Sequence, residues 1–561
     1  MDPAPAEPAP ARGADLIAGL AIAGLLLPEA VAYSAIANLP PVAGLAGLFA
    51  GLLAYGALGS SRFAVVSATS SSAAFLAAAV ASLPGDPATR AALASGLVLA
   101  TGGLFVLASA ARLGNASGFI ARPVLQGFAL GLALVIAVRQ VARMGGLDMH
   151  GTLLHALPDL VARRGDLNPW GIGLGFGAYA LLHLLGRLPR VPSALVVIAL
   201  AIGLDALVPM AAHGIGSVGP IEPALSSLGP PVLDASQWLR LAELAGAMVL
   251  VLFAESYGTV RTLALRHGDP VSPNRDLAAL GIANLVSGLA HGVPVGAGYS
   301  ASTANEAAGA QSRRAGWYAA GAVLALLLVA RGAIERTPEP VLAAVVLHAI
   351  GRSLRPTVLA PYFRWRRDRV IALAGFLAVV SLGVLDGLLA GIAASIFMML
   401  RDFSTPRISE LGRLGSGHDF VVLRLHPQAR IEPGVLVLRP EAPLFFGNAE
   451  AILAHILERL PPGCAVRTLV LSLEESPDLD ATALEALREF ARTLAQRGVH
   501  LILARVKEPV RELFARAKLP ELPEAICSTW SVDDAVRAAH AHRKTGAPAA
   551  SAHPAVAGEA A

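Results

Sequence analysis

Residues 371–402 read IALAGFLAVVSLGVLDGLLAGIAASIFMMLRD, two apolar runs that end in a charged pair. A helix that crosses a membrane needs about 20 mostly apolar residues, so the runs 371–384 and 386–401 are candidate spans. The chain before them is built in the same way, whereas the chain after Arg401-Asp402 has the pattern of a soluble α/β protein. The sequence therefore predicts a membrane body followed by a soluble C-terminal part.

The overall composition supports this division. The 561 residues are 55% hydrophobic and only 15% charged, whereas soluble domains average about 25% charged residues. The net charge of +4 would suit nucleic acid, but the arginines of the body sit in short loops between apolar runs, where membrane topology accounts for them. We expect a lipid bilayer as a partner and no nucleic acid.

The membrane body, residues 14–402, contains two similar sets of apolar segments on either side of a polar loop at 210–236. This arrangement, about seven segments plus seven, predicts an inverted repeat of the kind common in secondary transporters, with halves at about 14–209 and 238–402. The predicted segments of the first half are 14–37, 42–59, 63–83, 88–111, 117–141, 170–186 and 191–209. Those of the second half are 238–258, 276–292, 297–310, 315–333, 338–351, 370–384 and 386–401.

The distribution of arginines predicts the orientation of the chain. With a cytoplasmic N-terminus, the loops on the cytoplasmic side carry most of the arginines, for example the group Arg364, Arg366, Arg367 and Arg369. Such an excess marks cytoplasmic loops. An even number of spans then leaves the C-terminal part in the cytosol, and the expected location is the inner (plasma) membrane of a bacterium.

The remaining parts of the chain are assigned by composition and periodicity. Residues 1–13 form a Pro/Ala-rich leader that we expect to be disordered, and 403–433 is interpreted as a linker. Alternating strand and helix patterns over 434–544 predict a small α/β domain. The Ala-rich tail 545–561 is again expected to be disordered.

Two polar stretches interrupt the apolar helices, at 67–72 and at 296–303. If helices begin there, their unpaired backbone N–H groups and partial positive charge suit an anion, and two such ends near the middle of the membrane make a binding site. The alternative is that these Ser and Thr residues pack helices closely and bond within them. The spacing alone leaves both interpretations open.

Two acidic residues lie within the apolar body. Glu255 follows a long apolar run, and Glu29 follows Pro28, where we expect a break in the first helix. A carboxylate inside the membrane is a candidate proton carrier or cation ligand; the alternative is that each lies near a helix end and reaches water.

An enzyme is not indicated. The sequence contains no cluster of metal ligands, no nucleophile elbow and no phosphate loop, and its cysteines, Cys464 and Cys527, have no metal-ligand spacing. We expect no cofactor and no bound metal.

Several motifs, taken in order, resemble the SulP anion transporters, known as solute carrier family 26 in animals. The motifs of the body are Pro28 to Tyr33, Leu39 to Leu45, Gly59 to Arg62, Glu255-Ser256, Asn274 to Asn284 and Pro294 to Asn305. The C-terminal part resembles a STAS domain at Pro443 to Ala449 and at Asp480 to Thr482.

The resemblance implies fourteen spans in a seven-plus-seven inverted repeat, a core domain that moves against a gate domain, and a homodimer. It places a small anion, such as sulfate, bicarbonate or a dicarboxylate, between the third and tenth spans. Carried over by position, the substrate site is Glu29, Tyr33, Ser67, Ala68, Thr69, Ser70, Ala297, Gly298, Tyr299 and Ser300, and the coupling residues are Glu255 and Glu29.

The chain departs from the usual family pattern at the expected site. Many members have Gln where Glu29 stands and Arg where Ala301 stands, so this site is more negative. Repulsion between unit charges about 4 Å apart is about 4 kcal/mol at an effective dielectric constant of 20. We therefore expect proton-coupled symport of the anion, with sodium-coupled symport or anion exchange as alternatives. More distant alternatives are a nucleobase carrier and a membrane sensor that signals through the STAS domain.

Thr482 lies near the position that is phosphorylated in stand-alone STAS proteins, and the resemblance makes it a candidate regulatory residue. The alternative is that Asp480 and Thr482 only cap the helix that begins there.

Overall fold

The structure is a computed structural model, and it describes residues 13–545 except 115–121, 150, 189–192, 222–227, 352–353, 356, 358, 524–525 and 527–529. The expected leader and tail lie almost entirely outside the described residues. The chain divides into two compact units, Met1–Ile396 and Phe397–Ala561. Each is considered by itself.

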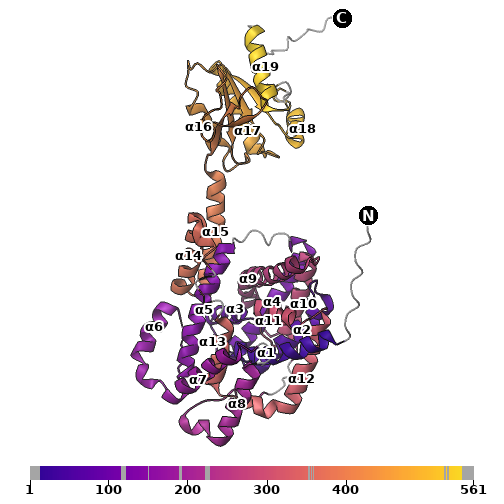
Figure 1. The fold of residues 1–561 in the computed structure, drawn as a ribbon, viewed down its shortest axis with the longest axis vertical. Coiled ribbons are helices and arrows are strands. Elements are labelled where there is room, and N and C mark those ends of the chain that lie inside the picture. The colour runs from indigo at the N-terminus through magenta and orange to yellow at the C-terminus, as the bar shows by residue number, and fades with distance from the viewer. Residues whose placement is uncertain are drawn as a thin grey trace. The chain divides into compact units, whose positions relative to one another are not determined.

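The first unit consists of two helical bundles (Figure 1). We call the first the core bundle. Within it, α10 packs against α2 and α4, and α1 packs against α2 and α12. Its elements are α1 (Ala14–Ile36), α2 (Pro41–Leu58), β1 (Val66–Ala68), α3 (Ser70–Ala81), α4 (Pro87–Ala110), α9 (Ala235–His267), α10 (Pro273–Leu289), β2 (Val295–Ala297), α11 (Tyr299–Ala307) and α12 (Arg314–Glu335).

We call the second bundle the gate bundle. Within it, α14 packs against α5, and α13 packs against α5 and α7. Its elements are α5 (Arg122–Met144), α6 (Leu153–Ala162), α7 (Pro169–Leu185), α8 (Ser193–Leu207), α13 (Glu339–Ile350), α14 (Arg366–Leu382) and α15 (Val384–Ser404). Short 3-10 helices lie at Arg164–Asp166, Met210–His213 and Tyr362–Arg364.

A helix, or a strand and half-helix, occupies the place of every predicted apolar segment. By length and composition alone, six helices among the described residues would cross a membrane; most of the remaining spans are shorter than 18 residues or broken by a strand. Within the first unit, the helices differ from expectation at three places. The short helix α6 was not predicted, Pro28 lies inside a continuous α1, and α9 continues to His267.

The third span of each half is broken in the same way. A three-residue strand precedes a short helix in both halves, and the strands β1 and β2 pair antiparallel, with Val66 opposite Ala297 and Ala68 opposite Val295. Backbone that is not helical is tolerated in a membrane only where protein or a cavity satisfies it. Here the ladder provides partners, and Asn284 exchanges two 2.9 Å hydrogen bonds with the backbone of Val295.

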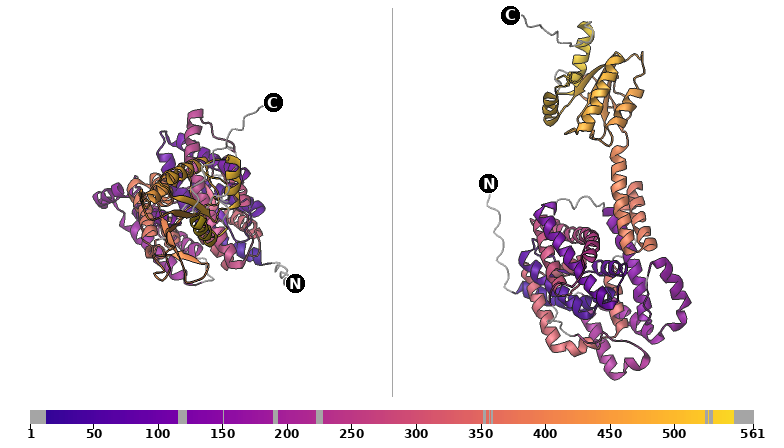
Figure 2. Two further views of the ribbon diagram at one scale, coloured as in Figure 1. Left: turned by 90° about the horizontal axis from the view of Figure 1, so that it is seen from above. Right: turned by 180° about the vertical axis from the view of Figure 1, so that it is seen from behind.

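The second unit begins within α15 and is built on one five-stranded sheet of order β4-β3-β5-β6-β7 (Figure 2). β5 (Val435–Pro440), β6 (Thr468–Ser472) and β7 (His500–Ala504) pair in parallel, and β3 (Ile408–Arg413) pairs antiparallel with β4 (Phe420–Val422) and with β5. The helices are α16 (Ala449–Glu458), α17 (Ala481–Gln496), α18 (Glu508–Ala517) and α19 (Val532–Thr545).

The segment 403–433, which the sequence analysis interpreted as a linker, contains β3 and β4 and therefore contributes two strands to this sheet. Its polar, irregular composition hid them, because most side chains of β3 and all those of the edge strand β4 are only partly buried. Asn448 adds a contact to the last turn of α15, because its Nδ2 donates to the Phe403 carbonyl at 2.9 Å.

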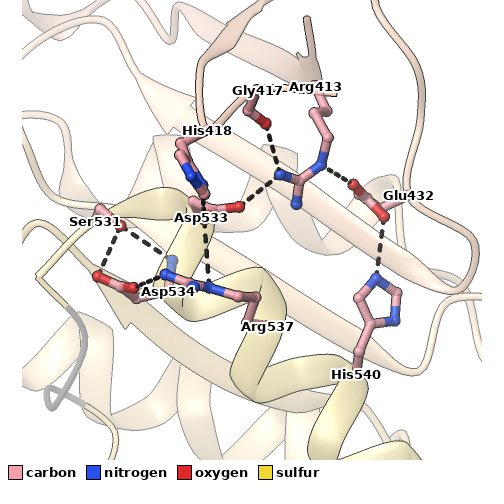
Figure 3. A network of polar contacts seen from close by, with 9 residues as sticks. All are labelled: Arg413, Gly417, His418, Glu432, Ser531, Asp533, Asp534, Arg537 and His540. Carbon is pink, nitrogen blue, oxygen red and sulfur yellow. Dashed lines mark hydrogen bonds and ion pairs between the residues drawn. The ribbon is translucent and has the colours of Figure 1, made fainter. Parts of the chain in front are cut away.

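A polar network joins α19 to the sheet (Figure 3). Arg413 donates to Asp533 at 2.5 Å and to Glu432 at 2.6 Å, while His418 contacts Asp533 and His540 contacts Glu432. Burial acts to raise the pKa of Asp533 and of Glu432, but the hydrogen bonds and charge from Arg413 outweigh it, so both pKa values lie below their ordinary range. The charged carboxylates therefore favour the docked position of α19.

Candidate functional site

The antiparallel ladder determines where the two half-helices begin. α3 follows β1 and α11 follows β2, so the helices start at opposite ends of a three-residue ladder and run away from it in opposite directions. The two starts are close, because a Cβ added to Gly298 would lie 3.5 Å from Thr69 Cγ2. Both positive helix ends therefore face the same region.

The first turns of these helices retain free donors. At α3, Thr69 caps the helix by accepting from the Ser72 N–H at 3.1 Å, which leaves the N–H groups of Ser70 and Ser71 without an acceptor in the described chain. At α11 the capping position is Gly298, which has no side-chain cap. The first N–H groups of a helix have no intrahelical partner, so both ends can donate to a bound anion.

The adjacent residues Glu255 and Ser256 of α9 hold both broken spans. Ser71 Oγ of α3 donates to Glu255 Oε2 at 2.5 Å, and Ser256 Oγ accepts from the Ala297 N–H of β2 at 2.8 Å. Gly296 allows this approach, because a Cβ there would come within 2.9 Å of Ser256 Oγ. Glu255 thus lies in the middle of a long helix, and not near a helix end.

A cavity of about 750 Å³ lies between the two bundles and in front of the half-helices. Its lining includes both carboxylates, and Arg261 is the one basic side chain among the described residues that line it. Predicted site residues that line the cavity are Glu29, Tyr33, Ser67, Ala68, Thr69, Ser70, Glu255, Gly298, Tyr299 and Ser300.

Glu29 lies deep in this cavity. Its side chain is only 6% exposed, and no described residue forms a hydrogen bond or ion pair with it. Burial of a carboxyl group without a partner is unfavourable when the group is charged. A proton or a bound cation would remove that penalty.

Two predicted residues lie elsewhere. Ala297 is completely buried in β2 and contributes its backbone to the ladder instead of lining the cavity. Thr482 is an exposed residue of the second unit, at the start of α17, where Asp480 provides the cap through a 2.8 Å bond from the Ala483 N–H. The capping interpretation therefore holds for Asp480, and the regulatory role of Thr482 stays a prediction.

Sequence reasoning missed one wall of the cavity. The gate bundle contributes residues from α5, from the end of α13 and from the loop before α14, including Gln126, Phe128, Ile350 and Tyr362. These residues have no polar pattern that would mark them in the sequence. Ser71 belongs to the predicted polar stretch 67–72 but was not included among the individual site residues, although its position in that serine cluster could have indicated it.

The cavity opens toward one side of the membrane unit. Its lining follows the last part of α9 to Arg261 and Thr262, both exposed, and the first part of α5. At the other end of α5, Arg143 Nη1 donates to the Ala35 carbonyl at the end of α1 at 3.1 Å. This bond joins the two bundles, so the structure is open at the side where α9 ends and closed at the side where α1 ends.

Comparison with known proteins identifies the family. The profile of the sulfate permease family matches residues 13–367, and that of the STAS domain matches residues 426–533. A probable sulfate transporter of Mycobacterium tuberculosis is 34% identical over 514 residues, which cover 90% of this chain and 91% of the relative. The chain belongs to the sulfate permease family. Sulfate transporter 3.1 of Arabidopsis thaliana is 24% identical, with 90% of this chain and 81% of the relative covered.

Solved structures of two anion transporters have a similar fold. The murine solute carrier 26 family member A9 anion transporter, solved in the inward-facing state, aligns with a TM-score of 0.85 at 21% identity, covering 94% of this chain and 91% of that one. The transmembrane domain of the cyanobacterial bicarbonate transporter BicA aligns with a TM-score of 0.59 at 22% identity, covering 68% of this chain and 97% of that one. The predicted fold class, a polytopic helical transporter body with a C-terminal STAS domain, is confirmed. This member of the sulfate permease family is an integral membrane protein of an anion transporter family.

Proposed function

We propose that this chain is a proton-coupled symporter that moves sulfate, or an anion of similar size, across the membrane by alternating access. The observation that carries the proposal is one cavity in which the starts of two half-helices, each with free backbone N–H donors, meet two carboxylates. Sulfate is the first candidate because the related proteins named above are described as sulfate transporters. Bicarbonate and dicarboxylates are further members of the same substrate class.

The anion is proposed to bind at the starts of α3 and α11. The N–H groups of Ser70, Ser71, Tyr299 and Ser300 point from two positive helix ends, and helix starts bind sulfate and carboxylate groups readily. Ser67 and Thr69 add hydroxyl groups beside them. This binding needs no group that is specific for one particular anion, which is why several small anions fit the same site.

The carboxylates explain why the anion needs a companion. With Glu29 and Glu255 both ionised, an arriving anion meets two negative charges, and repulsion of about 4 kcal/mol per pair is expected at about 4 Å and a dielectric constant of 20. Protonation of Glu255 or Glu29 removes the repulsion that comes from that carboxylate. Alternating access would then carry the proton and the anion together.

Sodium is the second candidate for the coupling ion. Thr69 Oγ1 lies 2.9 Å from Ser71 Oγ, which in turn contacts Glu255, and hydroxyl and carboxylate oxygens are ligands that hard cations accept. Exchange of one anion for another is the remaining transport alternative. A nucleobase carrier and a sensor without transport are the more distant ones.

The test is uptake by the purified full-length chain in proteoliposomes. Labelled sulfate, bicarbonate and fumarate are supplied with and without an inward proton gradient, and uptake of one of them that rises with the gradient supports the proposal. Uptake that is independent of the proton gradient but depends on sodium would make sodium the coupling ion. Uptake that depends on internal anion would indicate exchange. No uptake of any anion, tested beside labelled uracil, would favour the nucleobase carrier or the sensor.

The cellular arrangement is also proposed. The arginine distribution supports a bacterial plasma membrane with the N-terminus and the STAS domain in the cytosol, so the open side of the cavity faces the cytosol. We further propose a homodimer, in which the STAS domain supports dimerisation or trafficking and does not bind the substrate.

A further inference from the structure

The segment Tyr362–Arg369, here called the interfacial segment, is unusually rich in arginine and aromatic residues. It reads YFRWRRDR and joins the 3-10 helix Tyr362–Arg364 to the start of α14. Trp365 is 70% exposed and Phe363 43% exposed. Four arginines within six residues, against the single acid Asp368, give this short surface a strong positive charge.

Three of these arginines have no partner that would explain their position. Arg364, Arg366 and Arg369 are exposed, and their side chains form no hydrogen bond or ion pair with the residues that the structure describes. Arg367 differs, because it has an interaction elsewhere in the chain. Internal ion pairing therefore leaves most of the charge of the interfacial segment available for a ligand.

The arginines continue into an apolar stripe on the same face of α14. Arg366, Val370, Leu373 and Leu377 follow one another at intervals of three or four residues, which places them on one side of a helix. Val370 is 49%, Leu373 38% and Leu377 59% exposed. A face that is positive at its end and apolar along the span matches the headgroup and acyl chain of one lipid molecule.

We propose that the interfacial segment binds the headgroup of an anionic phospholipid, whose acyl chains cover the exposed stripe of α14. Arginine contacts phosphate through two parallel hydrogen bonds, and Trp and Phe lie preferentially at the level of lipid headgroups. The site also reaches the transport cavity, because Tyr362 lines that cavity two residues before Arg364. Bound lipid therefore holds one wall of the cavity mouth.

The test is native mass spectrometry of the purified full-length chain with equimolar phosphatidylglycerol and phosphatidylcholine. We expect preferential retention of phosphatidylglycerol, and a loss of that preference by about tenfold or more in R364Q/R366Q/R369Q, because this variant removes three positive charges that attract anionic lipid. The matched control R90Q/R163Q/R240Q removes three exposed arginines elsewhere on the membrane unit and should keep the preference. Thermal unfolding of each variant verifies that it is folded.

Three outcomes would overturn the proposal. The first is an unchanged lipid preference in the triple variant, or an equal loss in the control, which would reflect general surface charge. The second is complete displacement of the lipid by inorganic phosphate, which would assign the arginines to a soluble anion. The third is efficient disulfide formation between two copies carrying Leu377→Cys in native membranes, which would show that a second copy covers the stripe. Lipid retention is measured without transport, so failure here leaves the proposed function untouched.

Discussion

Glu255 is the residue on which the proposed coupling depends most directly. In Glu255→Gln the hydrogen bond from Ser71 persists, but the side chain can no longer carry a proton, so we expect acceleration of uptake by an inward proton gradient to fall by at least about tenfold, or about 1.4 kcal/mol. Uptake into proteoliposomes with and without an inward proton gradient, compared at several external pH values, measures this.

The matched control is Glu243→Gln on the same helix, where the side chain is 63% exposed and outside the cavity lining. It should transport like the natural chain. If Glu255→Gln keeps both its uptake rate and its pH dependence, Glu255 is not the proton carrier, and Glu29→Gln becomes the next variant to measure.

Asp276 stabilises the core bundle at residue scale. It is 2% exposed and accepts from the Tyr55 hydroxyl at 2.9 Å, the Ser60 N–H at 2.9 Å and the Ser60 hydroxyl at 2.7 Å. Asp276→Ala leaves these donors without an acceptor, and each buried unsatisfied group costs about 1–3 kcal/mol. We expect a clearly lower unfolding temperature in detergent for Asp276→Ala. The control Asp166→Ala, at an exposed position, should unfold at the same temperature as the natural chain. Equal unfolding temperatures would contradict this.

At the scale of elements, we expect the contact between α5 and α1 to hold the cavity closed on the side where α1 ends. Arg143 is one helical turn beyond Arg139, but only Arg143 reaches the core bundle, at the Ala35 carbonyl. Because a few kcal/mol separate alternating conformations, loss of this bond in Arg143→Gln should favour opening on the side where α1 ends. Arg139→Gln is the control.

The measurement uses Ala129→Cys, a cavity position, in a chain without its natural cysteines. Labelling by a membrane-impermeant maleimide, applied from the side of the membrane where α1 ends, should become several-fold faster with Arg143→Gln and not with Arg139→Gln. Equal labelling rates would show that this contact does not hold the cavity closed.

At the scale of the whole molecule, the docking of α19 on the STAS sheet should depend on pH. The pKa values of Asp533 and Glu432 are lowered in the folded state from their ordinary values of 3.8 and 4.5. Their stabilising effect is therefore present above those ordinary values and is lost as pH falls through the lower folded values.

Hydrogen exchange of the full-length chain, corrected for intrinsic pH effects, should accordingly show protected α19 amides at neutral pH and loss of protection below about pH 4. Asp533→Asn should lose protection already at neutral pH, because it removes the charge that Arg413 contacts. Glu458→Gln, an exposed carboxylate of the same domain, is the control. Protection that is independent of pH in the natural chain would contradict the assignment.

The STAS domain itself should be dispensable for substrate binding. The cavity is lined entirely by residues before Phe397, so a chain that ends at Thr405 should bind labelled sulfate with unchanged affinity in detergent, while its dimer fraction or its delivery to the membrane falls. Loss of binding by that purified body would show that the domain takes part in the transport site.

Local patterns in the sequence were sufficient to predict many of the elements of this protein. Length and hydropathy locate the spans, because each must cover the bilayer, and the serine runs locate the helix starts, because polar residues are expensive in lipid. The two carboxylates stand out for the same reason. The order of the motifs was sufficient to identify the family, and the strand periodicity was sufficient to predict β5, β6 and β7.

Only the tertiary structure decided how these parts meet. It shows that Ser256 and Asn284 complete the backbone hydrogen bonding of β2, and that Ala297 belongs to the ladder and does not line the cavity. It also shows that β3 and β4 come from the expected linker, and that a mostly apolar wall of gate-bundle residues lines one side of the cavity. Each of these depends on contacts between residues far apart in the chain. The sequence by itself determined which segments enter the membrane, because burial in lipid is a property of each segment alone. The structure decided which side is open, because that is a property of two bundles packed against each other.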